Sequence, residues 1–183
     1  MNFIKFLPHA GIIALLAALM QFMDMSSDFG AEGAQTHYFY GWAGFAAWAC
    51  YFLNGCTVKG GAKVIGCWVA GVIASIAIYE LAGLLCGMAE PKIAVSAAVG
   101  IVAFFVILFE KVPALDFIPA WFIGAACFFA MTNHVNAGDW SKSVAPILIS
   151  CVIGQIFGYV TVALRTAYGN IIDNNTESEV KEN

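Results

Sequence analysis

The stretch PAWFIGAACFFAMTNHVNAGDW, residues 119–140, begins as an apolar run and ends in a cluster of polar residues. Runs of this kind recur along the chain, since 61% of its residues are hydrophobic and only 11% are charged. A soluble domain has about a quarter of its residues charged. The composition therefore indicates a membrane protein, and the apolar part of the quoted stretch is expected to be one of its spans.

Six apolar runs are long enough to cross a bilayer, because a helix needs roughly 20 residues to span a hydrocarbon core of about 30 Å. We predict an all-α membrane protein with six transmembrane helices. The spans lie near residues 5–23, 38–54, 64–87, 93–109, 117–133 and 143–166. They form a six-span domain over residues 1–168, and the acidic residues 169–183 are expected to be a disordered cytoplasmic tail.

The few cations predict the orientation, because cytoplasmic loops are enriched in Lys and Arg. With six spans, six of the eight cations fall on the side of both termini: Lys5, Lys59, Lys63, Lys111, Arg165 and Lys181. The other side carries only Lys92 and Lys142. Both termini are therefore expected in the cytoplasm. The short loops and the lack of a signal-peptide cleavage pattern after the first span suggest a multi-pass protein of the bacterial inner membrane.

The second predicted span echoes the fifth. Aligning residues 41–61 with the quoted stretch places Phe45 on Phe122 and Cys50 on Cys127. Because the two spans are three apart, the second copy would be inverted, as in transporters whose pathway lies at a pseudo-twofold interface. The sequence therefore favours two inverted three-helix repeats, with a chance match of common membrane residues as the alternative.

Small residues predict how the helices pack, because they let backbones approach closely in lipid. Pairs with GxxxG spacing are Gly83 with Gly87 and Gly154 with Gly158. We expect these glycines to form helix contacts within the chain, and contacts between subunits are the alternative.

Four residues are candidates for a solute pathway: Glu80, Gln155, Trp48 and Trp42. Glu80 is the one acid placed inside a span, and intramembrane ionisable residues usually face a cavity or a partner. The alternative is that its carboxylate reaches water near the interface. Gln155 more often links helices, Trp48 more often packs in the core, and Trp42 suits an interfacial belt.

Four further residues lie on the expected outer side: His37, His134, Asp139 and Trp140. A histidine titrates between pH 5 and 8, so His37 and His134 are candidates for a pH-sensing mouth. Simple solvation is the more common role. Asp139 is better placed as the N-cap of the last helix, and Trp140 as an interfacial anchor.

No catalytic or cofactor motif is present. The six cysteines lie at 50, 56, 67, 86, 127 and 151, with neither a disulfide framework nor metal-ligand spacing. We find no phosphate-binding loop, nucleophile elbow or basic patch for nucleic acid. The sequence therefore predicts a protein that is not an enzyme and holds no metal or cofactor, although a membrane enzyme using Glu80 and His134 remains an alternative.

Several motifs resemble the YcdZ-like bacterial inner-membrane proteins, a family defined by a domain of unknown function. The motifs are WAGF at 42–45, YF at 51–52, IPAWFIGAACFF at 118–129, GDW at 138–140 and IFGY at 156–159. The resemblance covers roughly residues 40–165 and implies a multi-span inner-membrane protein. This chain departs from the family in longer outer loops around 24–35 and before Gly138.

A second resemblance points to a function. Six spans in a chain of 183 residues and a Gly-Asp-Trp leading into the last helix are similar to the amide and urea channels. This resemblance implies a homo-oligomer in which each protomer has a conduit for small uncharged solutes. We therefore expect a passive channel or facilitator for a small neutral or weakly acidic solute; the alternative is an accessory subunit that binds another membrane protein.

Overall fold

The computed structural model describes residues 3–29 and 36–182, which form six α-helices and one pair of short strands. The helices are α1 (Phe3–Met25), α2 (Gly41–Leu53), α3 (Val58–Cys86), α4 (Pro91–Leu108), α5 (Ile118–His134) and α6 (Ser141–Glu182). A 3₁₀ turn, η1 (Phe109–Lys111), follows α4. Strands β1 (Asp28–Phe29) and β2 (Thr36–His37) pair antiparallel between α1 and α2.

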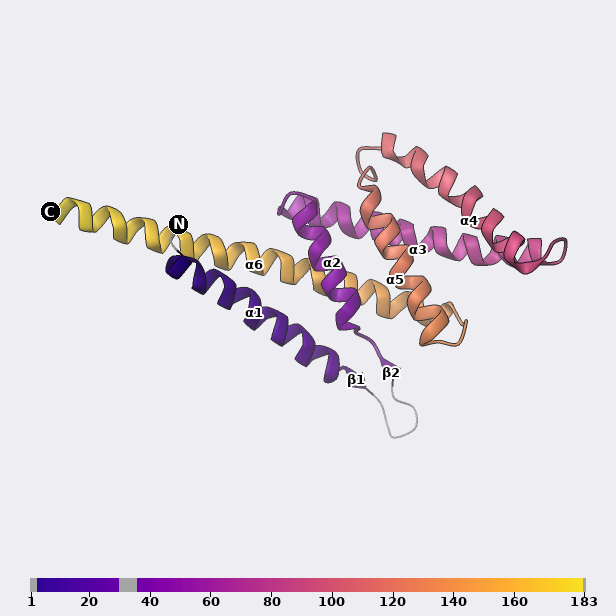
Figure 1. Cartoon of the computed structure of the whole chain (residues 1–183), viewed down its shortest axis with the longest axis horizontal. Coiled ribbons are helices and arrows are strands. Elements are labelled where there is room, and N and C mark those ends of the chain that lie inside the picture. Colours follow the sequence, from indigo (N-terminus) through magenta and orange to yellow (C-terminus); the bar gives the residue numbers. More distant parts are fainter. Residues whose placement is uncertain (1–2, 30–35, 183) are drawn as a thin grey trace.

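The predicted six-helix class is confirmed. Consecutive helices alternate in direction: α1, α3 and α5 run toward the lower right of Figure 1, and α2, α4 and α6 run toward the upper left. Within the described residues, four helices are long and apolar enough to cross a membrane, namely α1, α3, α4 and α6. At 1.5 Å per residue, the 13 residues of α2 extend over about 20 Å. The two short helices, α2 and α5, lie between the long ones (Figure 1).

Two helices begin where side chains satisfy backbone groups rather than where the apolar run begins. α3 starts at Val58, before the predicted 64, because the Thr57 hydroxyl accepts a hydrogen bond from the Gly60 N–H at 3.0 Å. α2 starts at Gly41, after the predicted 38, because the Tyr40 N–H donates to the Ser150 hydroxyl at 2.9 Å. This bond holds the chain before α2 in an extended form against α6.

The structure differs most from the expectation at the C-terminus. α6 continues to Glu182, so residues 169–182 are helical where we expected a disordered tail. A helix that is already formed grows by one hydrogen bond per residue, without a new nucleation cost. No proline follows Pro146 to end it, and the tail contains Glu and Lys, which favour helix.

The helices pack in a pattern that relates the first three to the last three. α2 packs mainly on α6, and α5 packs mainly on α3; α1 lies along α6, and α4 lies along α3. α3 and α6 also contact each other at the centre. A half-turn about the viewing direction of Figure 1 exchanges the α1–α6 pair with the α4–α3 pair, and α2 with α5. This arrangement supports the predicted inverted repeat.

The same relation holds for single residues. Gly154 of α6 lies directly against the Gly44 carbonyl of α2, and Gly71 of α3 lies directly against the Trp121 carbonyl of α5. The alignment that places Cys50 on Cys127 also places Gly44 on Trp121. In each half, the tightest contact between two helix backbones therefore falls at equivalent positions of the short helices α2 and α5.

The corner between the second and third helix of each half also matches. Gly55 and Cys56 have φ values of 86° and 57°, and Ala137 and Gly138 have φ values of 49° and 90°. Two consecutive left-handed residues turn the chain sharply at each place, and one residue of each pair is glycine, which adopts this conformation without steric cost. Both corners thus turn through two consecutive residues with positive φ.

Only one of the two predicted glycine pairs packs within the chain. A Cβ on Gly158 would meet the Tyr51 ring at 2.5 Å, and Gly154 is equally close to α2. A Cβ on Gly83 would have no neighbour within 4 Å, and one on Gly87 would meet only the Leu84 carbonyl at 3.5 Å. The prediction of intrachain packing is therefore wrong for Gly83 and Gly87, because their stretch of α3 lies open.

We predict that Gly154→Ala lowers the free energy of unfolding by about 1–3 kcal/mol, since the added methyl group forces α2 and α6 apart. The matched control Gly83→Ala is expected to be neutral or to stabilise α3 by up to about 1 kcal/mol, because alanine is the better helix former. Denaturant titration of purified protein in detergent measures both values. Equal destabilisation by the two variants would contradict the packing described.

Candidate functional site

Gln155, near the middle of α6, carries a buried polar group without a partner. Its side chain is 5% exposed, and its Nε2 donates to the Ala47 carbonyl of α2 at 2.6 Å. Its Oε1 is buried and accepts no hydrogen bond from any described residue. A buried acceptor left unpaired costs about 1–3 kcal/mol. The side chain therefore links two helices with one end and leaves the other free for a donor.

A hollow of about 440 Å³ lies beside this amide, between α3 and α6 at the C-terminal end of α2. Tyr51 forms part of its wall, because the ring is held between Gly61 of α3 and Gly158 of α6. The remaining wall is mainly apolar, with Tyr159 at its edge. We call this space the Gln155 hollow.

A second hollow, of about 530 Å³, continues from it toward the α2–α3 turn. The two share Tyr51, Val58 and Tyr159, and the second one also reaches Thr57 and Asn170. No charged residue lines either hollow in the described part of the chain. An uncharged groove thus leads from the end of the molecule that bears the α2–α3 turn to Gln155, and its wall beside Gln155 is mainly apolar.

Packing alone does not require a glutamine at this position. The pairing of Gly71 with Gly154 makes Val72 of α3 the counterpart of Gln155. Val72 is buried like Gln155, but it is apolar. Since valine satisfies the same packing in the other half, the need to fill space does not by itself explain the amide of Gln155.

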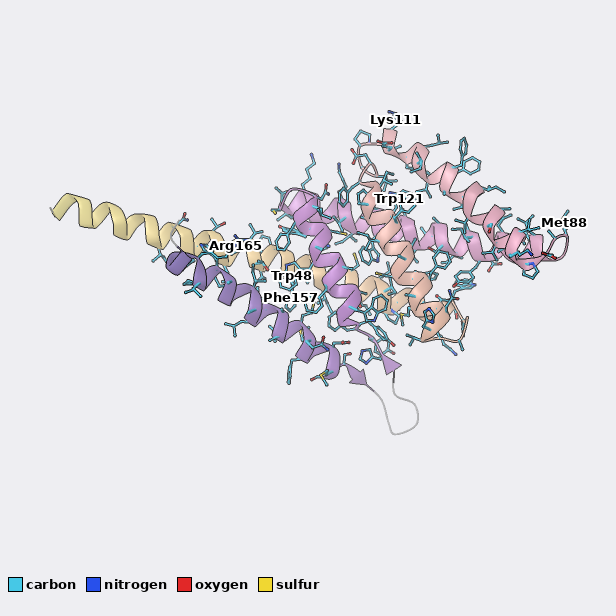
Figure 2. All side chains as sticks on the ribbon, viewed as in Figure 1. Trp48, Met88, Lys111, Trp121, Phe157 and Arg165 are labelled. Atoms are coloured by element: carbon cyan, nitrogen blue, oxygen red, sulfur yellow. The ribbon has the colours of Figure 1, made fainter. Side chains whose placement is uncertain are left out.

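The other predicted pathway residues lie elsewhere. Trp48 is buried against Phe157, with ring centroids 5.7 Å apart, on the side of α2 that faces α1 (Figure 2). Its Nε1 is buried without a partner among the described residues. Trp42 is 42% exposed and packs edge-on against Tyr40. The structure therefore does not bring the four predicted residues into one pathway.

Glu80 is exposed on α3 and makes no hydrogen bond or ion pair within the described ranges. α3 has 29 residues and extends over about 43 Å, more than a hydrocarbon core of about 30 Å. Glu80 lies about 9 Å from the last residue of the helix, Cys86. This position favours the alternative that its carboxylate reaches interfacial water.

His37 belongs to a polar cluster that joins the end of α1 to the start of α2. Its Nε2 lies 3.0 Å from Asp24 Oδ1 and 3.1 Å from the Ser27 hydroxyl. Ser27 also donates to the Phe39 carbonyl at 3.1 Å. The Ser27 hydroxyl also lies 3.3 Å from His37 Nδ1, so the cluster fastens the entrance of α2 to the end of α1 through several polar contacts.

The polar end of residues 119–140 forms the corner between α5 and α6. Asp139 Oδ1 accepts hydrogen bonds from the Ser141 N–H at 3.2 Å and from the Ser141 hydroxyl at 2.6 Å. The Lys142 ammonium lies 3.2 Å from Asp139 Oδ2. His134 is exposed, and Trp140 packs half-buried against the core. Asp139 therefore holds the first residue of α6, but it lies one residue before the N-cap position at which we expected it.

Sequence reasoning missed two residues of the Gln155 hollow and one buried histidine outside it. Tyr51 and Tyr159 of the Gln155 hollow lie in apolar runs and look like ordinary span residues. His9 is buried in α1 with its ring edge-on to Tyr168, at a centroid distance of 5.0 Å, and its Nδ1 has no described partner. The signal that could have identified His9 is its position inside the first apolar run.

We predict that Asp139→Asn lowers the melting temperature at pH 7, and that the difference from the wild-type protein disappears as the pH falls below the lowered folded-state pKa of Asp139. The Ser141 hydroxyl and then the Lys142 ammonium hold the pKa of Asp139 below its usual value of about 3.9. A lowered folded-state pKa stabilises the fold above that usual value, and the effect is lost as the pH falls through the folded-state pKa. Melting curves across this range test it, with exposed Glu110→Gln as the control; a pH-independent difference would contradict the role of charge.

Six helices, four of which are long and apolar enough within the described residues to cross a membrane, define a multi-span helical membrane protein. Residues 10–165 match the model of a family described as proteins of unknown function, DUF1097. The chain belongs to this family, which confirms the first resemblance.

A curated relative is the inner membrane protein YcdZ of Escherichia coli (strain K12), with 33% identity over 120 residues. The match covers 64% of this chain and 66% of YcdZ, so the chain spans just under two thirds of its relative. No solved structure matches. The protein is an integral inner-membrane protein. The similarity to the amide and urea channels stays a prediction.

Proposed function

We propose that this protein is a passive channel or facilitator for a small neutral or weakly acidic solute, with no enzymatic step. The observation that carries the proposal is the buried, unpaired Oε1 of Gln155, a residue that lines the Gln155 hollow. A buried acceptor in an apolar wall offers one hydrogen bond to a passing N–H or O–H group. This chemistry suits amides, alcohols and protonated carboxylic acids.

The uncharged lining supplies selectivity. An ion that entered would lose its hydration shell and would find no opposite charge to replace it. A neutral solute has a smaller desolvation cost than an ion, and it regains a hydrogen bond at Gln155. The expected homo-oligomer belongs to the proposal, with one pathway in each protomer.

Liposome swelling with a panel of small amides, alcohols and weak acids tests this proposal. We expect flux through the wild-type protein, and a tenfold or greater loss with Gln155→Val, which removes a hydrogen bond of about 1.4 kcal/mol or more. Valine is the residue found at the equivalent position of α3, Val72, so the fold should persist. Gln21→Val, an exposed glutamine of α1, is the matched control and should leave flux unchanged.

Glu80→Gln and His134→Ala separate the earlier candidates from Gln155. We expect both variants to retain the wild-type flux and its pH dependence, since both residues are exposed away from the Gln155 hollow.

If the wild-type protein carries no solute at neutral or acidic pH, the accessory-subunit function becomes the better explanation. The mostly exposed, apolar α4 would then be the surface that binds a partner.

We also propose that both termini are cytoplasmic. The Lys63 ammonium lies 2.8 Å from Asp116 Oδ1, so the start of α3 and the α4–α5 loop lie at the same end of the molecule. In single-cysteine variants, Cys56 of the α2–α3 turn should then react with a membrane-impermeant maleimide only after cell lysis. Exposed Cys86 at the end of α3 should react in intact cells. If Cys56 reacted in intact cells and Cys86 only after lysis, the termini would lie on the opposite side of the membrane.

A further inference from the structure

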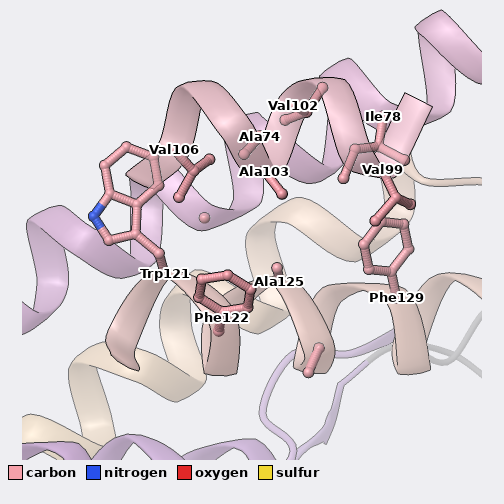
Figure 3. A pocket seen from close by; sticks show the side chains of 12 residues that line it. Ala74, Ile78, Val99, Val102, Ala103, Val106, Trp121, Phe122, Ala125 and Phe129 are labelled. Atoms are coloured by element: carbon pink, nitrogen blue, oxygen red, sulfur yellow. The ribbon is translucent and has the colours of Figure 1, made fainter. Parts of the chain in front are cut away.

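A separate hollow of about 250 Å³ lies between α3, α4 and α5, away from Gln155. Figure 3 shows its side chains facing one another across the gap, from α4 and α3 on one side and from α5 on the other. All are aliphatic or aromatic apart from one glycine. The single polar atom of Trp121, its Nε1, donates to the Leu115 carbonyl at 2.9 Å. The space therefore offers no hydrogen bond.

The equivalent space in the other half of the molecule is filled. There, between α1, α2 and α6, Trp48 packs with Phe157 and Met20 in one buried cluster. The residue equivalences place Ala125 of α5 where α2 has Trp48, and Ala74 of α3 where α6 has Phe157. The hollow therefore exists because small side chains replace large ones within the same helix packing.

The hollow opens on the surface that faces the bilayer. Val99 and Phe122, which line it, are 42% and 52% exposed. The surface continues along α4 over Phe104 and Phe105, which are also exposed. α4 is one of the helices long and apolar enough to span the membrane, so hydrocarbon lies next to the opening. A hydrocarbon chain can enter from that side, because it needs no hydrogen-bonding partner.

We propose that the hollow between α3, α4 and α5 binds an acyl chain of a membrane phospholipid. The chain would occupy the space that Trp48 and Phe157 occupy in the other half, and it would complete the packing of α4 against α5. α4 has few buried residues of its own, namely Ala94, Ala98 and Val106, so a bound chain would add contacts that the protein lacks. This proposal does not depend on the transport function.

Native mass spectrometry of the full-length protein released from nanodiscs of a single phosphatidylethanolamine tests the proposal. We expect the wild-type protein to retain one phospholipid per protomer. Ala125→Trp, which copies the other half, should lose it. Ala74→Phe fills the hollow from the opposite wall and should also lose it, and it serves if the first variant does not fold. Ala97→Trp adds the same bulk on the exposed face of α4, outside the hollow, and should retain the lipid.

The other half provides the reciprocal test. Trp48→Ala opens the equivalent space, so this variant should retain a second phospholipid. Equal lipid retention by the wild-type protein and both filling variants would overturn the proposal, as would a wild-type protein that retains none. Filling variants that dissociate an oligomer without changing retained lipid would show that a second copy occupies the hollow, which also overturns it.

Discussion

Helices inside a bilayer gain nothing by hiding apolar surface from water, so their association depends on how closely their backbones approach. In this protein the closest approaches are Gly154 of α6 on α2 and Gly71 of α3 on α5. Each contact presses a short helix against a long one. The remaining packing follows, since α1 and α4 then lie along the long helices and the two halves meet where α3 contacts α6.

The two halves share this frame and differ in how they fill it. At one pair of equivalent positions Trp48 occupies space that Ala125 leaves open, and at another Gln155 carries an amide where Val72 is apolar. The helix packing accommodates either residue at each of these positions, so the two halves differ in side chains while their backbones keep the same arrangement. The hollow between α3, α4 and α5 arises at one such departure, and the Gln155 hollow is lined by a residue from the other.

The polar residues at the ends of the helices serve mainly to hold the frame. Ser27 and Asp24 fasten His37 at the entrance of α2, and Asp139 binds the first turn of α6. Glycines at the two sharp corners allow each long helix to follow a short one directly. The polar ending of the stretch 119–140 therefore forms a structural corner, and its role at an outer mouth stays a prediction.

Much of the fold could be predicted from the sequence, because a bilayer requires every backbone group to be bonded within its own helix, and apolar length then reveals the helices. The echo between Cys50 and Cys127 also indicated the inverted repeat. The site was harder to predict: Gln155 was identified as polar, but Tyr51 beside it looks like any span residue. Only the tertiary structure decided that Glu80 is exposed and that Ala125 borders a cavity, because burial depends on which helix faces which, and hydropathy carries no information about partners.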